Sequence, residues 1–103
     1  MINFEDTIIA CSSPLGSGAI SCIRISGKDC PKIFKKITKK EIKHKKVSIS
    51  EIKLGKGIEE KCVLTSYLFP NSYTGEDTVE ISCHGNPIIV DLILSFLNDL
   101  GCR

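Results

Sequence analysis

Residues 78–101 read TVEISCHGNPIIVDLILSFLNDLG and carry the strongest structural signals in the sequence. The segment TVEISC predicts a β-strand over Thr78–Cys83, because apolar and β-branched residues dominate it. Asn86 then predicts a helix N-cap, Pro87 suits the first helical position, and Gly101 suits the C-terminal cap. Since the helix between them is almost entirely apolar, we expect it to pack against a sheet or against a partner chain.

Working outward, the rest of the chain predicts one further helix and four further strands. The segment AISCIRIS over Ala19–Ser26 is rich in β-branched residues and predicts a strand. Apolar residues recur every three or four positions over Lys28–Thr38, which predicts an amphipathic helix. The other predicted strands are Thr7–Ser12, Val47–Leu54 and Lys61–Phe69. This order indicates an α+β fold in which a mixed sheet of about four to five strands is layered with two helices.

The composition is that of one ordinary globular domain. The chain has 103 residues, of which 42% are hydrophobic and 25% charged, so we expect a single domain over residues 1–103 with one modest core. This apolar content excludes a disordered chain. No uncharged apolar run reaches the roughly 18 residues of a membrane span. The N-terminus, MINFEDTII, has no basic residue ahead of its apolar run, unlike a signal or transit peptide. We therefore expect no membrane association and a cytoplasmic location.

Six cysteines are many for so short a chain, but their spacing fits neither a disulfide framework nor a zinc site. They are far apart, with no Cys-x-x-Cys pair, and four of them sit in apolar, strand-like runs. Without a secretion signal, reduced thiols are expected. The cysteines are therefore predicted to pack as small hydrophobic residues, and no metal site is predicted.

Positive charge is concentrated in residues 28–46, which hold nine Lys against Asp29 and Glu41. Clustered Lys attracts phosphate, so a nucleic-acid-binding surface is one interpretation. The other is an ordinary solvated surface, since Phe34 is the only aromatic residue among these lysines. Composition alone leaves both open.

Two isolated charges stand out in the predicted strands. Arg24 is the only basic residue of AISCIRIS, and Glu80 is the only acid of TVEISC. Placing such a charge in an apolar strand costs several kcal/mol unless it is partnered. The two residues either satisfy each other across the sheet or a chain interface, or they form a ligand site. In the second case Arg would grip an anionic group, and the Glu carboxylate would match an amino-pyrimidine edge with two parallel hydrogen bonds.

Two further residues are weaker candidates. Tyr73, in the loop NSYTGED, either stacks on a planar ligand or anchors the loop. His84 follows the TVEISC strand and is expected to be a packed loop residue rather than an acid or base. No Ser–His–Asp arrangement can be assembled around it, so no catalytic residue is predicted.

Three segments together resemble the N-terminal domain of the MnmE (TrmE) family of tRNA modification GTPases. They are DTIIACSSPLGSGAISCIRISG (residues 6–27), PNSYTGEDTVEISCHGNP (residues 70–87) and the closing helix through Leu100 and Gly101. They occur in the family's order and spacing, and the resemblance covers essentially the whole chain. Departures from the common PPGRG and HGGP patterns fall at Leu15, Ser17 and Asn86, which touch a loop and a helix cap.

The resemblance implies a domain that binds 5-formyl-tetrahydrofolate, or a related one-carbon tetrahydrofolate, and that holds two protomers together as a homodimer. The folate-contacting Arg of the family falls on Arg24 and its folate-contacting Glu on Glu80, the two residues that the charge pattern singles out. From its chemistry, Tyr73 is a candidate to cover the pterin ring.

For the full-length family the resemblance implies more than this chain contains. Members continue into a helical domain and a G domain that uses GTP, Mg²⁺ and K⁺, and they act on tRNA with a FAD-dependent partner protein. This chain has no phosphate-loop motif, so it is expected to be a fragment that is non-catalytic alone. The expected function is a folate-binding and dimerisation domain of a tRNA wobble-uridine (U34) modification GTPase. The alternatives are a small Lys-rich nucleic-acid-binding module and a dimerisation scaffold without ligand.

Overall fold

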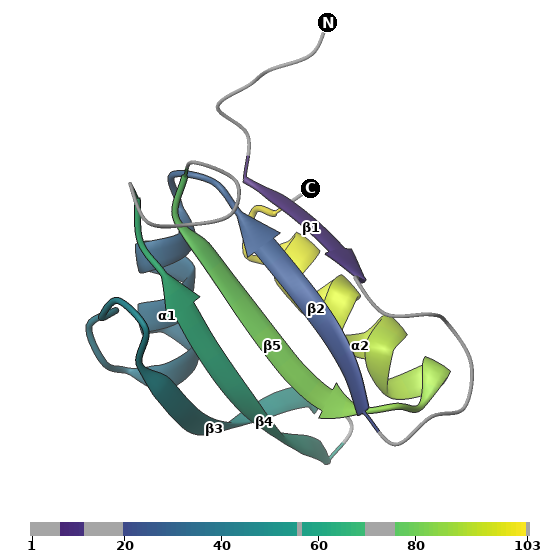
Figure 1. The fold of residues 1–103 in the computed structure, drawn as a ribbon. Coiled ribbons are helices and arrows are strands. Elements are labelled where there is room, and N and C mark those ends of the chain that lie inside the picture. Colours follow the sequence, from purple (N-terminus) through teal and green to yellow (C-terminus); the bar gives the residue numbers. More distant parts are fainter. Residues whose placement is uncertain (1–6, 12–19, 56, 70–75, 103) are drawn as a thin grey trace, which may run out of the picture.

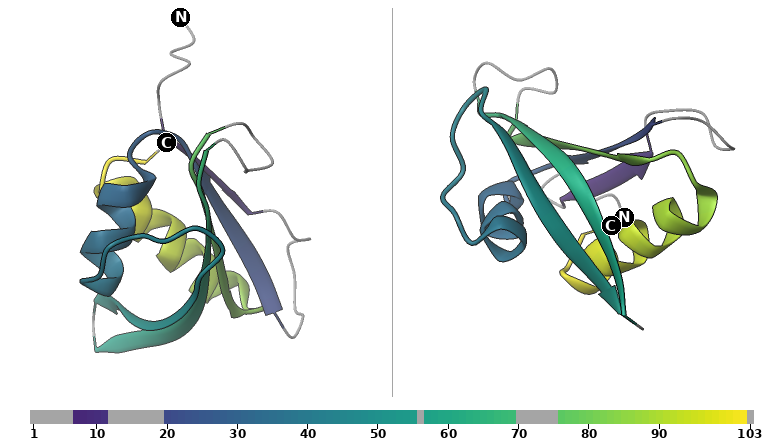
Figure 2. Two further views of the ribbon diagram at one scale, coloured as in Figure 1. Left: turned by 60° about the vertical axis from the view of Figure 1, so that its left-hand side comes forward. Right: turned by 90° about the horizontal axis from the view of Figure 1, so that it is seen from below.

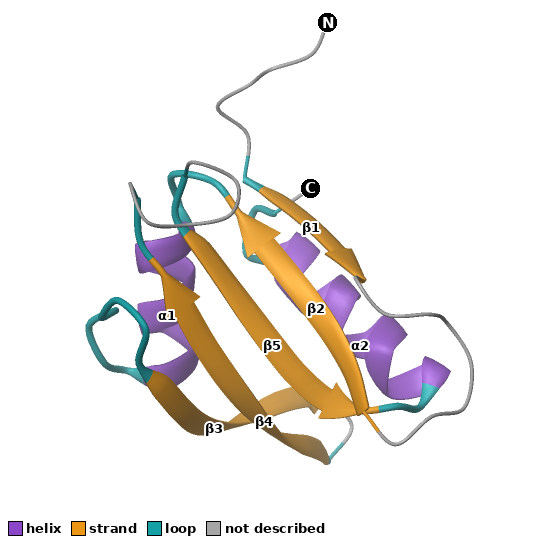
Figure 3. Cartoon of the chain, in the orientation of Figure 1, coloured by secondary structure: helices purple, strands orange, loops and turns teal. Residues whose placement is uncertain are grey.

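A computed structural model describes residues 7–11, 20–55, 57–69 and 76–102 of the chain. The described residues form one sheet with two helices packed on the same face (Figures 1 and 2). The elements, in chain order, are β1 (Ile8–Cys11), β2 (Ile20–Ser26), α1 (Cys30–Thr38), β3 (Val47–Gly55), β4 (Ile58–Tyr67), β5 (Thr78–His84) and α2 (Pro87–Asp99). The predicted α+β fold with two helices is confirmed (Figure 3).

The five strands lie in the order β1-β2-β5-β4-β3, and every neighbouring pair is antiparallel. The described sheet is therefore antiparallel throughout rather than mixed. The reason is the path between β2 and β3, because α1 and residues 39–46 bring the chain back to the end of the sheet at which β2 stops. The Lys45 amide, just before β3, donates to the carbonyl of Ser66 near the end of β4. A parallel pair would need the chain to cross to the opposite end of the sheet.

The hydrophobic core lies between the sheet and the two helices. Burial alternates along β2 and along β5, so every second side chain of each strand faces the helices. The principal core residues are Ile23, Ile25, Leu64, Val79 and Ile81 from the strands, Ile33, Phe34 and Ile37 from α1, and Val90, Ile93 and Leu97 from α2. Neither of the two described helices lies over the other face of the sheet (Figure 2).

The ends of α2 follow the predicted signals. The side chain of Asn86 accepts a hydrogen bond from the Ile88 amide at 2.8 Å, which confirms the N-cap. Pro87 occupies the first turn, and Gly101 has a φ of 108° just beyond the helix. Local sequence chemistry therefore sets where this helix begins and ends.

The described cysteines are free thiols, as expected. Burial raises the pKa of Cys30 and of Cys62 to about 12 and that of Cys102 to about 11. These thiols are therefore protonated at neutral pH and pack as small apolar groups. Among the described residues, no His, Cys, Asp and Glu side chains gather closely enough to hold a metal ion. Neither helix in the described part of the chain is long and apolar enough to span a bilayer.

Candidate functional site

The uncovered side of the sheet, called the open face below, carries the candidate site. Ile23 and Ile25 of β2 belong to the core, so the alternate residues Cys22 and Arg24 project from the open face. Glu80 does the same on β5, between the buried Val79 and Ile81. The two strands are neighbours in the middle of the sheet (Figure 1).

The structure brings Arg24 and Glu80 together. They are directly opposite each other in the β2–β5 register, and Arg24 Nη2 lies 3.2 Å from Glu80 Oε2. Cys22 Sγ donates to the same oxygen at 3.4 Å. The first of the two interpretations of these charges, pairing across the sheet, therefore holds within one chain. The pair is nevertheless accessible, since 37% of the Arg24 side chain and 20% of the Glu80 side chain are exposed.

Small side chains flank the pair on both sides. Ala10 of β1 is opposite Arg24, and Thr65 of β4 is opposite Glu80, so the four residues form one row across the sheet. Neither neighbour is large enough to cover the ion pair, which is in keeping with the exposure of both side chains. A carboxylate and a guanidinium fixed side by side can offer acceptors and donors to one polar edge of a planar ligand.

Tyr73 lies outside the described residues, so its role at this site stays a prediction. The residues on either side of that segment are held near one another, because the Phe69 amide donates to Asp77 Oδ1 at 2.9 Å. Ser26 Oγ, at the end of β2, donates to Glu76 Oε1 at 2.9 Å. The loop therefore leaves and rejoins the sheet near the end of the β2–β5 pair.

His84 differs from the expectation of a packed loop residue. It is the last residue of β5, and 74% of its side chain is exposed. Its ring Nδ1 lies 2.7 Å from Glu60 Oε2, and its backbone amide donates to the same oxygen at 2.8 Å. The Glu60 side chain is 7% exposed. The last paired residues of β4 and β5 at this end are Val63 and Ser82, and past them the Glu60 carboxylate takes the hydrogen bond from the His84 amide. A buried carboxylate therefore orients an exposed imidazole.

Sequence reasoning missed Glu60, although a signal existed. Alternation along β4 places Glu60 in the same row as the buried Cys62 and Leu64. A single acid in an otherwise buried row requires a partner, just as Arg24 and Glu80 did.

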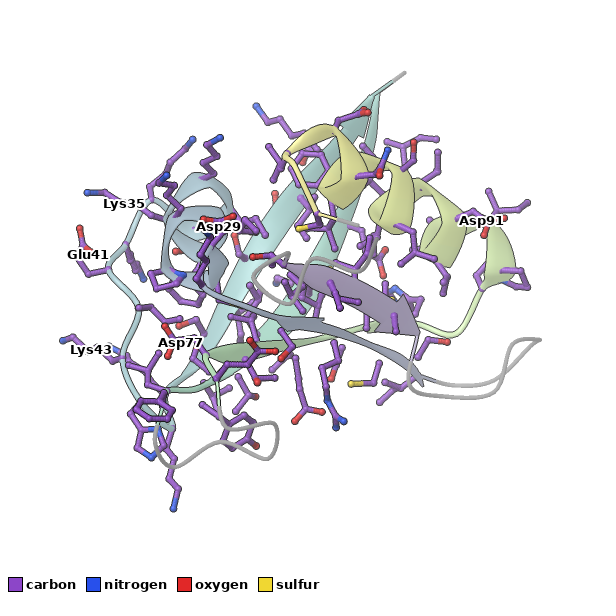
Figure 4. The ribbon with its side chains drawn as sticks, turned by 90° about the horizontal axis from the view of Figure 1, so that it is seen from above. Asp29, Lys35, Glu41, Lys43, Asp77 and Asp91 are labelled. Atoms are coloured by element: carbon purple, nitrogen blue, oxygen red, sulfur yellow. The ribbon has the colours of Figure 1, made fainter. Side chains whose placement is uncertain are left out.

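The lysine-rich segment lies around α1, which packs on the core face of the sheet (Figure 4). The Arg24–Glu80 pair projects from the other face, as the alternation of burial along β2 and β5 shows. Lys35 and Lys43 point outward in that view, and Lys35 Nζ lies 2.7 Å from Glu41 Oε1. The buried positions of α1 face the core, so its lysines line the solvated side of the helix. This arrangement is the one expected for a surface helix, and no described feature there adds an RNA-specific contact.

Comparison with known proteins gives a family match over nearly the whole chain. The family described as "GTP-binding protein TrmE N-terminus" matches residues 7–103. The tRNA modification GTPase MnmE of Francisella philomiragia subsp. philomiragia is 41% identical over 99 residues, which are 96% of this chain and 22% of that protein. The proteins of the same name from Francisella tularensis subsp. holarctica and subsp. novicida are 40% identical over the same shares. The chain thus spans about a fifth of the length of these relatives.

Proposed function

The chain belongs to the family of TrmE N-terminal domains, and from that premise we propose that it binds a one-carbon tetrahydrofolate, such as 5-formyl-tetrahydrofolate, on the open face of its sheet. The observation that carries this proposal is the accessible ion pair between Arg24 and Glu80 in the middle of that face. In this function the folate supplies the one-carbon unit, and the residues of this chain hold and orient it.

The chemistry of the two side chains fits the two kinds of polar group on a pterin ring. The carboxylate of Glu80 can accept two parallel hydrogen bonds from an amino-pyrimidine edge, and the guanidinium of Arg24 can donate to a carbonyl or anionic group. The ion pair and the bond from Cys22 Sγ already fix the position of Glu80. Less side-chain freedom is then lost when a ligand binds.

We expect Glu80→Gln to weaken the binding of 5-formyl-tetrahydrofolate by roughly tenfold or more, because the amide has one acceptor oxygen and no charge. Calorimetric titration of the parent and the variant measures this directly. Glu59→Gln is the matched control, since it removes an exposed carboxylate on β4. Equal affinity of the parent and Glu80→Gln would contradict the proposed site.

We further propose that the chain forms a homodimer. From its apolar sequence, α2 was expected to pack against the sheet or against a partner chain. In the structure it packs against the sheet and buries Val90, Ile93 and Leu97 in the core. The larger exposed apolar surface lies on the open face of the sheet, where two neighbouring side chains define an apolar patch. The patch consists of Val47 and Ile49 of β3, which are 59% and 65% exposed. A second copy covering this patch would leave the β2–β5 pair accessible.

Ile49→Lys should weaken this dimer by roughly tenfold or more, because the ammonium group would have to leave water without a partner. Sedimentation equilibrium of the parent and the variant measures the change. Ile88→Lys is the control, since Ile88 is 69% exposed on α2, away from the patch. If Ile88→Lys dissociates the dimer and Ile49→Lys does not, the interface lies on α2 rather than on the patch. If the parent chain is monomeric, the proposed dimer is wrong.

The relatives are named tRNA modification GTPases, and we propose that this chain serves the same process at the wobble uridine (U34) of tRNA. We propose a FAD-dependent protein and tRNA as its partners in that process, with GTP, Mg²⁺ and K⁺ assigned to the G domain that the resemblance implies for full-length members of the family. The proposal includes a cytoplasmic location, because the described cysteines are free thiols and such thiols persist in reducing compartments.

A further inference from the structure

A groove of about 240 Å³ lies on the open face, beside the end of β5. Its lining residues are Ile20, Lys61, Val63, Ser82, Cys83 and His84. It is continuous along β5 with the proposed folate site, because Glu80, Ser82 and His84 alternate along the same strand. The groove is smaller than the roughly 300 Å³ of the smallest usual ligand pockets, so it suits part of a ligand rather than a whole one.

Each kind of group in the groove has a definite recognition chemistry. Ile20 and Val63 are 68% and 38% exposed, and they form apolar surface on which an aromatic ring can lie. The exposed ammonium of Lys61 can bind a carboxylate. Ser82 adds a hydroxyl between them, within reach of either a donor or an acceptor.

The imidazole of His84 is held in one orientation by Glu60. An ionised carboxylate only accepts, so Nδ1, which lies 2.7 Å from Glu60 Oε2, is the donating nitrogen, and Nε2 can accept a hydrogen bond when the ring carries a single proton. The backbone amide of His84 is bound to the same oxygen, so the ring is tied to the end of the strand at two points. His84 Nε2 can therefore accept a hydrogen bond from a donor group of the ligand, such as an amide N–H.

We propose that this groove binds the aromatic amide arm of the ligand, with its ring on Ile20 and Val63, its amide N–H on His84 and its terminal carboxylate on Lys61. The acyl-glutamate arm of a folate combines these three groups, so the inference rests on the proposed function for the identity of the ligand. His84 is four positions beyond Glu80, which is about 13 Å along the strand. An extended folate with its pterin at Glu80 therefore has its arm directed along β5 toward the groove.

The test compares ligands with and without the arm. We expect Lys61→Gln to weaken 5-formyl-tetrahydrofolate by about tenfold and to leave 6-methyl-tetrahydropterin, which has no arm, unchanged. The matched control is Lys46→Gln, which removes an exposed charge from the other end of the sheet, next to Val47. A folate analogue methylated at the amide nitrogen should also bind more weakly, because it has no N–H for His84. This ligand-side change leaves the protein fold untouched.

Failure of this inference can be told apart from failure of the proposed function. If Glu80→Gln weakens folate binding as expected, while Lys61→Gln binds folate like the parent and the methylated analogue binds like the unmethylated folate, the proposed function stands and the arm does not occupy the groove. If the parent binds no folate, titration with 4-aminobenzoyl-glutamate alone decides the matter by NMR. Shifts at Lys61 and His84 would then support an aryl-amide site, and their absence would overturn it.

Discussion

Replacing Gly27 with alanine should lower the free energy of unfolding by about 3 kcal/mol or more. Gly27 has a φ of 146°, a conformation that L side chains rarely adopt, and a Cβ there would lie 2.6 Å from the Cα of Thr7. The atom in the way belongs to the backbone, so no rotamer change can relieve the clash. Urea unfolding followed by circular dichroism measures the loss.

The large expected effect arises because the starts of β1, α1 and β5 lie close together around Gly27. The Gly27 amide donates to the carbonyl of Asp77 at 2.9 Å, just before β5, and Thr7 Oγ1 accepts from the Asp29 amide at 3.0 Å, just before α1. Moving Thr7 away would therefore disturb the starts of β1 and α1 together. Gly57→Ala is the control, because Gly57 has a φ of 76° but no atom within 4 Å of an added Cβ. Its expected loss is about 1 kcal/mol, and equal losses at both positions would contradict the steric explanation.

Elements with local signals were predictable from the sequence, and their arrangement was not. The limits of α2 follow from Asn86 and Gly101, whose effects act within one turn of the helix. The insertion of β5 between β2 and β4 depends on the path of residues 39–46 instead, and no motif in that charged segment specifies it. β4 begins at Ile58 rather than at the predicted Lys61, because pairing with β3 continues to the Gly55–Ile58 register pair beside the turn.

The same division applies to the candidate site. Arg24 and Glu80 were found from the cost of an isolated charge in an apolar strand, which requires no knowledge of the fold. That they pair within one chain depends on β2 lying beside β5, although 56 residues separate them. The bond between His84 and Glu60 depends on where β4 and β5 stop pairing, and this end point became visible only in the structure.

Exchanging the two charges, with Arg24→Glu and Glu80→Arg combined, should preserve stability and strongly weaken folate binding. Either single change places two like charges opposite each other and is expected to cost about 1 kcal/mol, since both side chains are partly solvated. The double variant restores an opposite-charge pair on the same two strands, so its stability should return to within about 0.5 kcal/mol of the parent. Urea unfolding of the four proteins measures this cycle.

A ligand, unlike the ion pair, senses which strand carries the carboxylate. In the double variant the acceptor for the amino-pyrimidine edge has moved from β5 to β2, and the donor has moved the opposite way. The ligand can then no longer form the two charge-assisted hydrogen bonds to these side chains. We therefore expect the affinity for 5-formyl-tetrahydrofolate to fall by at least roughly a hundredfold. Titration calorimetry on the refolded double variant measures the loss. Full binding by a stable double variant would show that Arg24 and Glu80 are only a structural pair, whereas stability without binding would separate the ligand-binding role of these residues from their role in the sheet.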